Sequence, residues 1–284
     1  MLGPARGAVL AFGAALLLVG CTSTVDGTAS PAPVVAPTPG DDPLVDAPAV
    51  GTCHDIETTY SPLEVPPVVP CDAEHTGETA VVQDTGLALE AAYPTEDGID
   101  EGYLGDVWDE VCGYDLVQDY LQGQVGDQAY ASYTQVLPTQ EQWAAGARWV
   151  ACDITYGYGQ PEPAPGRMAG ALRSGETAPY RACLDGDAQV SDVVACSDDH
   201  WAEQISGSPD IAEGTPFPAD QAARAPIAAQ CLPAAVDYLD GPLPADVTVD
   251  ITTEDPDDWA GFPFATCVLV PTAGGTTDTS FRDQ

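Results

Sequence analysis

Two copies of one short motif, C-x3-H-x2-E, contain the residues best suited to chemistry. The first copy ends in His75 and Glu78, and the second ends in His200 and Glu203. A histidine beside a carboxylate can hold a metal ion or act as an acid–base pair. A metal site would also need thiolates or further histidines, and the chain has three histidines in all. We therefore predict no metal and no cofactor. Each histidine should pack against a disulfide, with metal binding or a role in recognition as the alternatives.

Motifs for nucleophilic catalysis are absent from the sequence. It has no G-x-S-x-G elbow, no phosphate-binding P-loop and no H-E-x-x-H zinc helix. Positions three apart on a strand also point to opposite faces, which separates each histidine from its glutamate unless a turn intervenes. We therefore predict that the protein is not an enzyme and has no catalytic residues. The alternative is an enzyme of cell-wall or small-molecule chemistry that uses His75 or His200.

One arginine and two tryptophans are further candidates. Arg148 should form a structural salt bridge with a carboxylate such as Glu141, with binding of an anionic group as the alternative. Trp143 and Trp259 each follow directly on a polar stretch and stand shortly before a glycine. We expect both to cap a hydrophobic core rather than to form an exposed binding surface.

The beginning of the chain resembles a bacterial lipoprotein signal. An apolar run from Ala8 to Val19 is too short to span a membrane and ends in Leu-Val-Gly-Cys, which resembles the lipobox. We predict a signal peptide over residues 1–20 and lipidation of Cys21, which would anchor the chain to the outer face of the cell membrane. The two acyl chains expected on such a cysteine are enough for stable anchoring.

Composition predicts two unstructured segments and excludes one class of partner. Residues 21–50 are rich in Pro, Thr and Ala and should form a flexible spacer. Residues 272–284 should be a disordered tail. The 45 acidic and 7 basic residues give a net charge of −38, which argues against nucleic acid as a partner because that interaction needs a cationic surface.

Eight further cysteines indicate a disulfide framework in an exported chain. The repeated His–Glu motif, together with a glycine six residues before the fourth and the eighth of these cysteines, indicates an internal duplication with four cysteines in each half. Three connectivities are possible within each half. We favour the pairing of first with second and third with fourth, which gives Cys53–Cys71, Cys112–Cys152, Cys183–Cys196 and Cys231–Cys267.

Hydrophobic periodicity predicts an α+β fold with two tandem ββαββ-like units, each a small, mainly antiparallel sheet with one covering helix. Pro226 and Pro233 should break or kink the second helix. The units should span residues 51–159 and 177–271, joined by a linker at 160–176. The expected strands are 63–71, 77–84, 130–137 and 147–156 in the first unit and 188–196, 201–206, 246–252 and 262–270 in the second, and the expected helices are 100–121 and 218–239.

Together these features resemble the actinobacterial septum-formation domain family. Its pattern is a cysteine, then V-x-C-x3-H-x-x-E, then a helical cysteine, then P-x4-W-x2-G-x-R-x3-C. In this chain the pattern corresponds to Cys53, the stretch from Val69 to Glu78, Cys112, and the stretch from Pro138 to Cys152. The second half departs from it, because Phe262 and the residues after it leave no counterpart of Arg148.

The resemblance implies an envelope protein linked to division septa. We predict a membrane-anchored, extracytoplasmic lipoprotein that acts as a non-catalytic binding or scaffold module of the cell envelope. Its partners should be the membrane, through the lipid on Cys21, and a protein or a component of the cell wall.

Overall fold

The computed structural model describes residues 42–57, 61–95, 107, 110–173, 175–187, 191–253 and 255–283. They all belong to one compact unit, which spans Thr38–Gln284. The expected signal peptide and Cys21 lie outside the described residues. In the part of the chain that is described, no helix is both long enough and apolar enough to cross a membrane.

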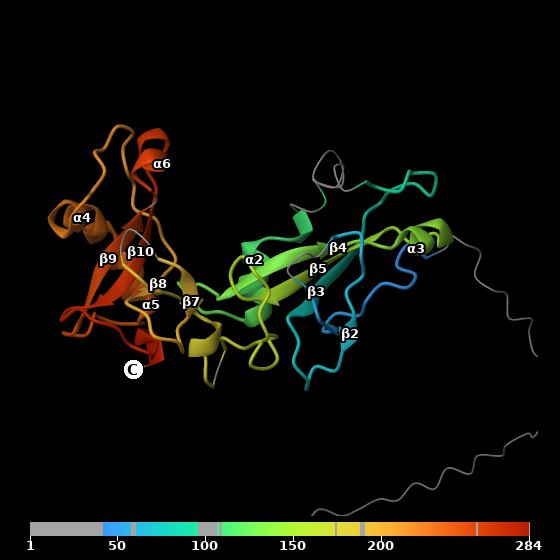
Figure 1. Cartoon of the computed structure of the whole chain (residues 1–284), viewed down its shortest axis with the longest axis horizontal. Helices are drawn as coiled ribbons and strands as arrows, with labels where there is room; N and C mark the ends of the chain where they lie inside the picture. Colours follow the sequence, from blue (N-terminus) through green and yellow to red (C-terminus); the bar gives the residue numbers. More distant parts are fainter. Residues whose placement is uncertain are drawn as a thin grey trace, which may run out of the picture. The chain divides into compact units, whose positions relative to one another are not determined.

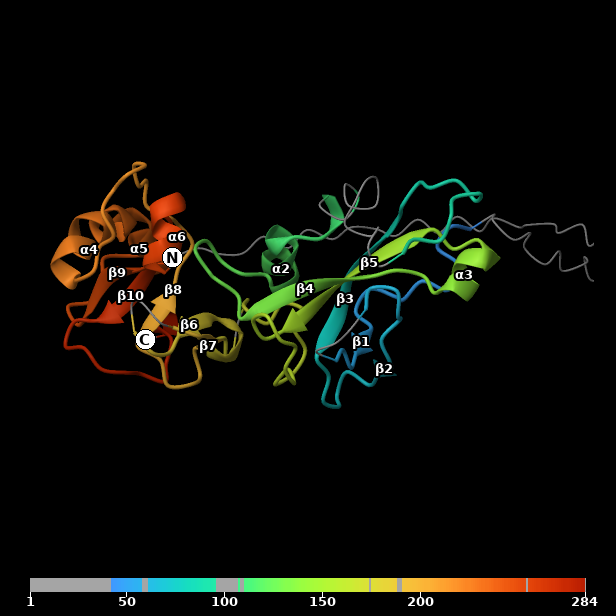
Figure 2. The same cartoon turned by 45° about the horizontal axis from the view of Figure 1, so that its top comes forward.

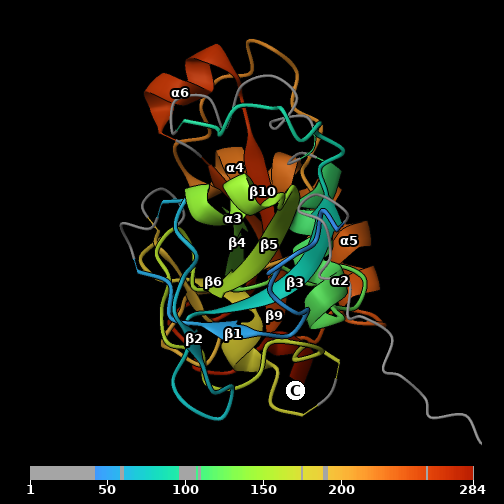
Figure 3. The same ribbon diagram turned by 90° about the vertical axis from the view of Figure 1, so that its right-hand side faces the viewer.

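The first sheet has five antiparallel strands in the order β2–β1–β3–β5–β4, which can be followed in Figures 1 and 3. Helix α2 covers one face, and the short helix α3 connects β4 to β5. The bounds are β1 Cys53–His54, β2 Val68–Val69, β3 Gly77–Asp84, α2 Tyr114–Leu121, β4 Ala131–Val136, α3 Gln140–Ala145 and β5 Trp149–Tyr156.

The second sheet has the corresponding order, β7–β6–β8–β10–β9, and Figure 2 shows its short strands β6 and β7. Three α-helices and three short 3-10 helices accompany it in the described part of the chain. The bounds are η2 Ala178–Tyr180, β6 Ala182–Leu184, β7 Val193–Ala195, β8 Ala202–Gln204, α4 Gln221–Ala228, η3 Ala229–Cys231, α5 Leu232–Tyr238, β9 Val247–Thr253, α6 Pro256–Gly261, β10 Ala265–Pro271 and η4 Phe281–Asp283.

The chain is therefore α+β, with two antiparallel sheets, as predicted, but the ββαββ order is incomplete. It omits β1 and β6, which carry the first cysteine of each set and are too short to show an alternating pattern. The strand expected at 63–71 is reduced to Val68–Val69 by the surrounding prolines. In the second sheet, the helical region is divided as expected. Pro226 lies in α4, and Pro233 occupies the first turn of α5, where proline is tolerated.

Four disulfides join the favoured pairs. Cys53 bonds to Cys71 and Cys183 to Cys196, and each of these bonds closes a short loop at the sheet edge. The other two, Cys112–Cys152 and Cys231–Cys267, attach the helical segment of each sheet to β5 and β10, the strands next to the sheet edge. Cross-links of this kind typically contribute about 2–4 kcal/mol each by restricting the unfolded chain.

The end of the expected spacer is part of the fold. Val45 packs with Val136, Trp149 and Ala151 on the face of the first sheet opposite α2. Its carbonyl oxygen also accepts a hydrogen bond from the Trp149 indole nitrogen at 3.1 Å. The spacer prediction for 21–50 is thus wrong over its last residues, because this sheet has a second apolar face that must be covered.

The described residues of the expected linker and of the expected disordered tail also belong to the fold. After β5 the chain returns across the first sheet, where Met168 and Leu172 are fully buried. After β10 it returns across the second sheet, where Ser280 and Phe281 are buried. We call residues 160–173 the first return segment and residues 272–283 the second return segment. Their composition resembles that of a linker, but each is fixed by a buried carboxylate, as described below.

Loop residues after α2 connect the two sheets. Isolated antiparallel bridges pair Asp127 with Ile205 and Ala129 with Arg181. The side-chain amide of Gln128 donates to the Ser206 hydroxyl at 2.8 Å. The two sheets therefore share a polar junction.

Candidate functional site

The first His–Glu motif forms a buried carboxylate site. Glu78 is fully buried on β3 and accepts three hydrogen bonds: from His75 Nε2 at 3.1 Å, from the Tyr120 hydroxyl at 2.6 Å and from the Met168 backbone N–H at 2.7 Å. The Arg167 guanidinium lies 3.7 Å from the same carboxylate. Tyr120 comes from α2 and Met168 from the first return segment, so Glu78 fixes both elements to the sheet.

The contact between His75 and Glu78 depends on a turn. His75 precedes β3, which begins at Gly77, so the opposite-face rule for strands does not separate the two side chains. The other ring nitrogen, Nδ1, lies 3.0 Å from the Ala73 carbonyl oxygen and must donate to it. Nε2 then faces a carboxylate oxygen, so one proton must lie between them. One hydrogen bond therefore joins His75 to Glu78, beside the two that Glu78 accepts from Tyr120 and Met168.

The second His–Glu motif has a different geometry. Glu203 is fully buried on β8 and accepts from the Tyr238 hydroxyl, from the Ser280 hydroxyl at 2.6 Å and from the Phe281 backbone N–H at 2.5 Å. Tyr238 lies on α5, and the other two donors lie on the second return segment. Burial raises the pKa of Glu203, although these donors and Arg181 oppose the shift.

His200 is not among the hydrogen-bond donors of Glu203. Its Nδ1 donates to the Asp198 carbonyl oxygen at 2.7 Å, and its backbone pairs with Thr277 of the second return segment. Its Nε2 is buried without a hydrogen-bond partner among the described residues. Burial lowers the pKa of His200, which favours the neutral imidazole.

Both histidines lie beside disulfide sulfurs. One nitrogen of His75 lies within 4.8 Å of Cys53 Sγ and a Glu78 oxygen, and one nitrogen of His200 lies within 4.8 Å of the sulfurs of Cys183 and Cys196. Oxidised sulfurs lack the thiolate charge that metal binding by cysteine requires. Both clusters are buried, as expected for histidines that pack against a disulfide.

Arg148 forms no salt bridge with a carboxylate of the described residues, Glu141 included. Its guanidinium is buried and donates to backbone carbonyl oxygens, at 2.8 Å to Trp143, 2.6 Å to Ala147 and 3.2 Å to Ala88, with a further bond to Leu89. It also lies 4.0 Å above the centre of the Trp143 ring. Arg148 therefore fixes the loop after β3 to the α3 turn, and the proposed pairing with Glu141 is wrong.

The two tryptophans play equivalent structural parts. Trp143 on α3 is buried, donates to the Ala91 carbonyl oxygen at 3.0 Å and meets Tyr93 edge to face. Trp259 on α6 is buried, donates to the Thr215 carbonyl oxygen at 2.8 Å and meets Phe217 edge to face. In both cases the aromatic partner stands two residues after the acceptor. Each tryptophan thus holds the long loop that leads to its helical region.

A second buried polar cluster in the first sheet was not predicted. His54 on β1 lies 3.0 Å from the Thr79 hydroxyl and 3.6 Å from the Asp153 carboxylate, and all three side chains are buried. Burial raises the pKa of Asp153, whereas His54 and Thr79 lower it. An aspartate in the middle of an otherwise apolar strand, Val150 to Ile154, was the one available signal.

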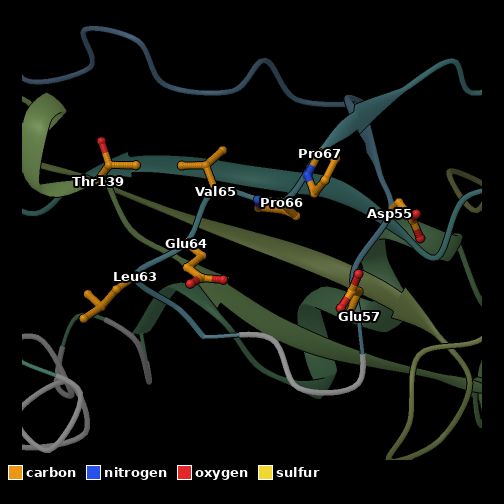
Figure 4. A pocket seen from close by; sticks show the side chains of 8 residues that line it. All are labelled: Asp55, Glu57, Leu63, Glu64, Val65, Pro66, Pro67 and Thr139. Carbon is orange, nitrogen blue, oxygen red and sulfur yellow. The ribbon is translucent and has the colours of Figure 1, made fainter.

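A hollow of about 510 Å³ lies at the β1–β2 edge. It is lined by the prolines 66 and 67 and by three carboxylates, and Figure 4 shows Glu64 across the hollow from Asp55 and Glu57. Because the charged side chains that line it are all acidic, it is unsuited to an anionic ligand.

Comparison with known proteins identifies a family. A family model described as "Septum formation" matches residues 50–261, which is well over half of the chain. No curated protein and no solved structure gives a significant match.

Proposed function

Because this chain belongs to the septum-formation family, we propose that it is an extracytoplasmic, lipid-anchored lipoprotein that serves septum formation as a non-catalytic binding or scaffold module. The family supports a role in cell division or in the envelope. The anchor, the absence of catalysis and the scaffold role are our proposal.

One observation supports the proposal that the protein is not a catalyst. Glu78 and Glu203 are fully buried, and each receives three hydrogen bonds from the chain itself. Donors of this kind satisfy a carboxylate and fix its position, but leave little capacity for a substrate. His75 and His200 are buried beside disulfides. These motifs therefore act as internal anchors, and binding is assigned to other surfaces.

The proposed location rests on the cysteines. Four disulfides persist most readily in an oxidising compartment outside the cytoplasm. We assign the remaining cysteine, Cys21, to lipidation, because it follows directly on an apolar run of signal-peptide length. The acyl chains would then hold the folded unit at the outer face of the membrane.

The duplication is also part of the proposal. The two sheets share one strand order, and each has a buried glutamate, a helical tyrosine, a return segment and a tryptophan that fixes a loop. Such agreement in long-range contacts supports descent of both halves from one repeated unit. A scaffold with two related platforms can contact two partners, or one partner at two places.

Labelling with a palmitate analogue tests the anchor. The full-length chain should incorporate label, Cys21→Ala should not, and the matched control Ser23→Ala should label like the unchanged chain. Retained labelling in Cys21→Ala would end the lipid proposal.

Localisation and rescue test the functional part. A tagged copy should concentrate at division sites and crosslink to an envelope protein or to cell-wall material. His75→Gln and His200→Gln should still restore septation in cells that lack the chain, because neither side chain takes part in chemistry. A uniform distribution without a crosslinked partner would contradict the septal role, and loss of rescue by a stably folded histidine variant would favour an enzyme.

A further inference from the structure

A groove of about 280 Å³ lies at the junction of the two sheets. One wall comes from α2 and the loop after β5, and the other comes from the end of β8 and the start of β10. The polar junction between Gln128 and Ser206 lies beside it. Both halves of the chain contribute to this site.

Aromatic rings form the apolar part of the groove. Tyr114, Tyr158 and Phe264 line it and remain 54%, 49% and 39% exposed. Burial, and next the neighbouring Tyr158 side chain, raise the pKa of Tyr114 to about 12. The Tyr114 ring also packs edge to face on Tyr133 with centroids 5.4 Å apart. Large aromatic side chains held in place yet open to solvent are typical of binding surfaces.

Amide side chains supply the polar part. Gln118, Gln128 and Gln204 line the groove from three different segments. Among the described residues, the amides of Gln118 and Gln204 have no hydrogen-bond partner, so their capacity is free for a ligand. Each amide offers both donors and an acceptor.

The groove is uncharged, although the chain has a net charge of −38. Its lining contains no acidic and no basic side chain. A cation would find no carboxylate there, and a phosphate or carboxylate ligand would find no arginine. A ligand that fits this groove is therefore neutral. It has apolar faces that can pack on the aromatic rings and hydroxyl-like groups that can hydrogen-bond to the glutamine amides.

We propose that this groove binds an uncharged pyranose glycan. The C–H faces of a sugar ring would stack on Phe264 and the tyrosines, and its hydroxyls would both donate to and accept from the glutamines. A proline-rich peptide fits less well, because its backbone offers mainly acceptors and would leave the amide oxygens unpaired. The groove volume of about 280 Å³ is slightly below the roughly 300–1,000 Å³ of pockets that enclose a drug-sized molecule. A groove of this size suits a glycan chain that lies across it and is not enclosed. This inference deepens the proposed function by naming the class of ligand.

Titration calorimetry on the full-length chain provides the test. The probes are the β-1,4-linked tetramers of N-acetylglucosamine and of glucose. At least one of the two tetramers should bind. Phe264→Ala and Gln204→Ala should each weaken that binding by about fivefold, since one aromatic contact or one hydrogen bond is worth about 1 kcal/mol. The matched control is Phe262→Ala, which removes a neighbouring ring that is 73% exposed and does not line the groove. It should bind like the unchanged chain, and all variants should have the same urea midpoint.

The possible outcomes distinguish failure of the glycan site from failure of the proposed non-catalytic function. Failure of both tetramers to bind at millimolar concentration, or equal loss in the Phe262→Ala control, would overturn the glycan site. Binding of a peptide with the sequence of residues 22–41 in place of the sugars would assign the groove to a proline-rich segment instead. Cleavage of a bound tetramer would overturn the non-catalytic function while leaving the glycan site intact.

Discussion

Glu78 and Glu203 occupy matching places in the two sheets, yet they differ in the donor that each takes from its own motif. Glu78 accepts a hydrogen bond from His75, whereas Glu203 accepts one from the Ser280 hydroxyl, and Nε2 of His200 has no partner among the described residues. What the two sites share is a helical tyrosine and a backbone N–H from a return segment. The comparison teaches that the buried carboxylate is the constant feature and that the histidine is one of several ways to satisfy it.

The surroundings of the two carboxylates differ as well. Arg167, near Glu78, is about half exposed. Near Glu203, the guanidinium of Arg181 is buried and bonds to Asp127 at 3.0 Å, and Arg282 bonds to the same aspartate at 2.8 Å. Asp127 belongs to the loop after α2, so this charge cluster ties the second sheet to the first.

The largest expected effect comes from breaking that cluster. Asp127→Ala leaves Arg181 and Arg282 without their shared buried partner, and loss of one member of a buried ion pair typically costs about 3–5 kcal/mol. Urea unfolding followed by circular dichroism measures the loss. The control Asp237→Ala removes an exposed carboxylate from α5 and should change stability by less than about 0.5 kcal/mol. A cost below about 1 kcal/mol for Asp127→Ala would show that the two sheets are stabilised independently.

The return segments should prove equally structural in the two halves. Met168→Ala and Phe281→Ala each remove a buried side chain and should destabilise the chain by about 2–5 kcal/mol. The same unfolding assay applies, with Arg173→Ala as a control on an exposed side chain. If Phe281→Ala lowered the unfolding free energy no more than the control, the second return segment would be the disordered tail that its composition predicts.

The two histidines should respond differently to the same substitution. His75→Leu removes a donor from buried Glu78 and should cost about 1–3 kcal/mol. His200→Leu removes only the hydrogen bond from Nδ1 to the Asp198 carbonyl oxygen, because Nε2 has no partner among the described residues, so its cost should be smaller, at most about 1 kcal/mol. The difference between the two unfolding free energies is the quantity to measure. Equal costs would mean that His200 makes a contact as strong as that of His75.

The sequence predicts the repeated parts of this fold well. Alternating apolar residues place the longer strands, and the proline positions account for the divided helix of the second half. The repeat reduces the disulfide pairing to three connectivities in each half, and the structure contains the favoured one. These features depend on local patterns, or on a comparison between the two halves, both of which can be read along the chain.

The contacts that organise the site are harder to predict, because they join distant segments. The first return segment is rich in glycine and proline and the second in threonine and glycine. The contacts that hold them include backbone N–H groups at Met168 and Phe281, which donate to buried carboxylates. Arg148 was expected to find a carboxylate, but carbonyl oxygens of a loop almost 60 residues away satisfy it. A composition-based reading cannot find partners of this kind.

The smallest expected effect is a change in the pH dependence of stability. Burial lowers the pKa of His200 below its ordinary value of 6.5, although Asp198, Asp199 and Asp278 oppose the shift. The folded state therefore binds fewer protons than the unfolded state, so this residue's contribution is complete above pH 6.5 and is lost as the pH falls through the lowered pKa. His200→Leu should flatten the decline in unfolding free energy below pH 6.5, whereas the exposed neighbour variant Ser197→Ala should keep it.

Glu203 acts in the opposite direction, because its raised pKa makes its contribution to the unfolding free energy fall as the pH rises from about 4.5. Glu203→Gln should therefore remove the decrease in unfolding free energy above about pH 4.5. If the pH profile of the unfolding free energy changed in neither His200→Leu nor Glu203→Gln, the difference between the two carboxylate sites would be contradicted.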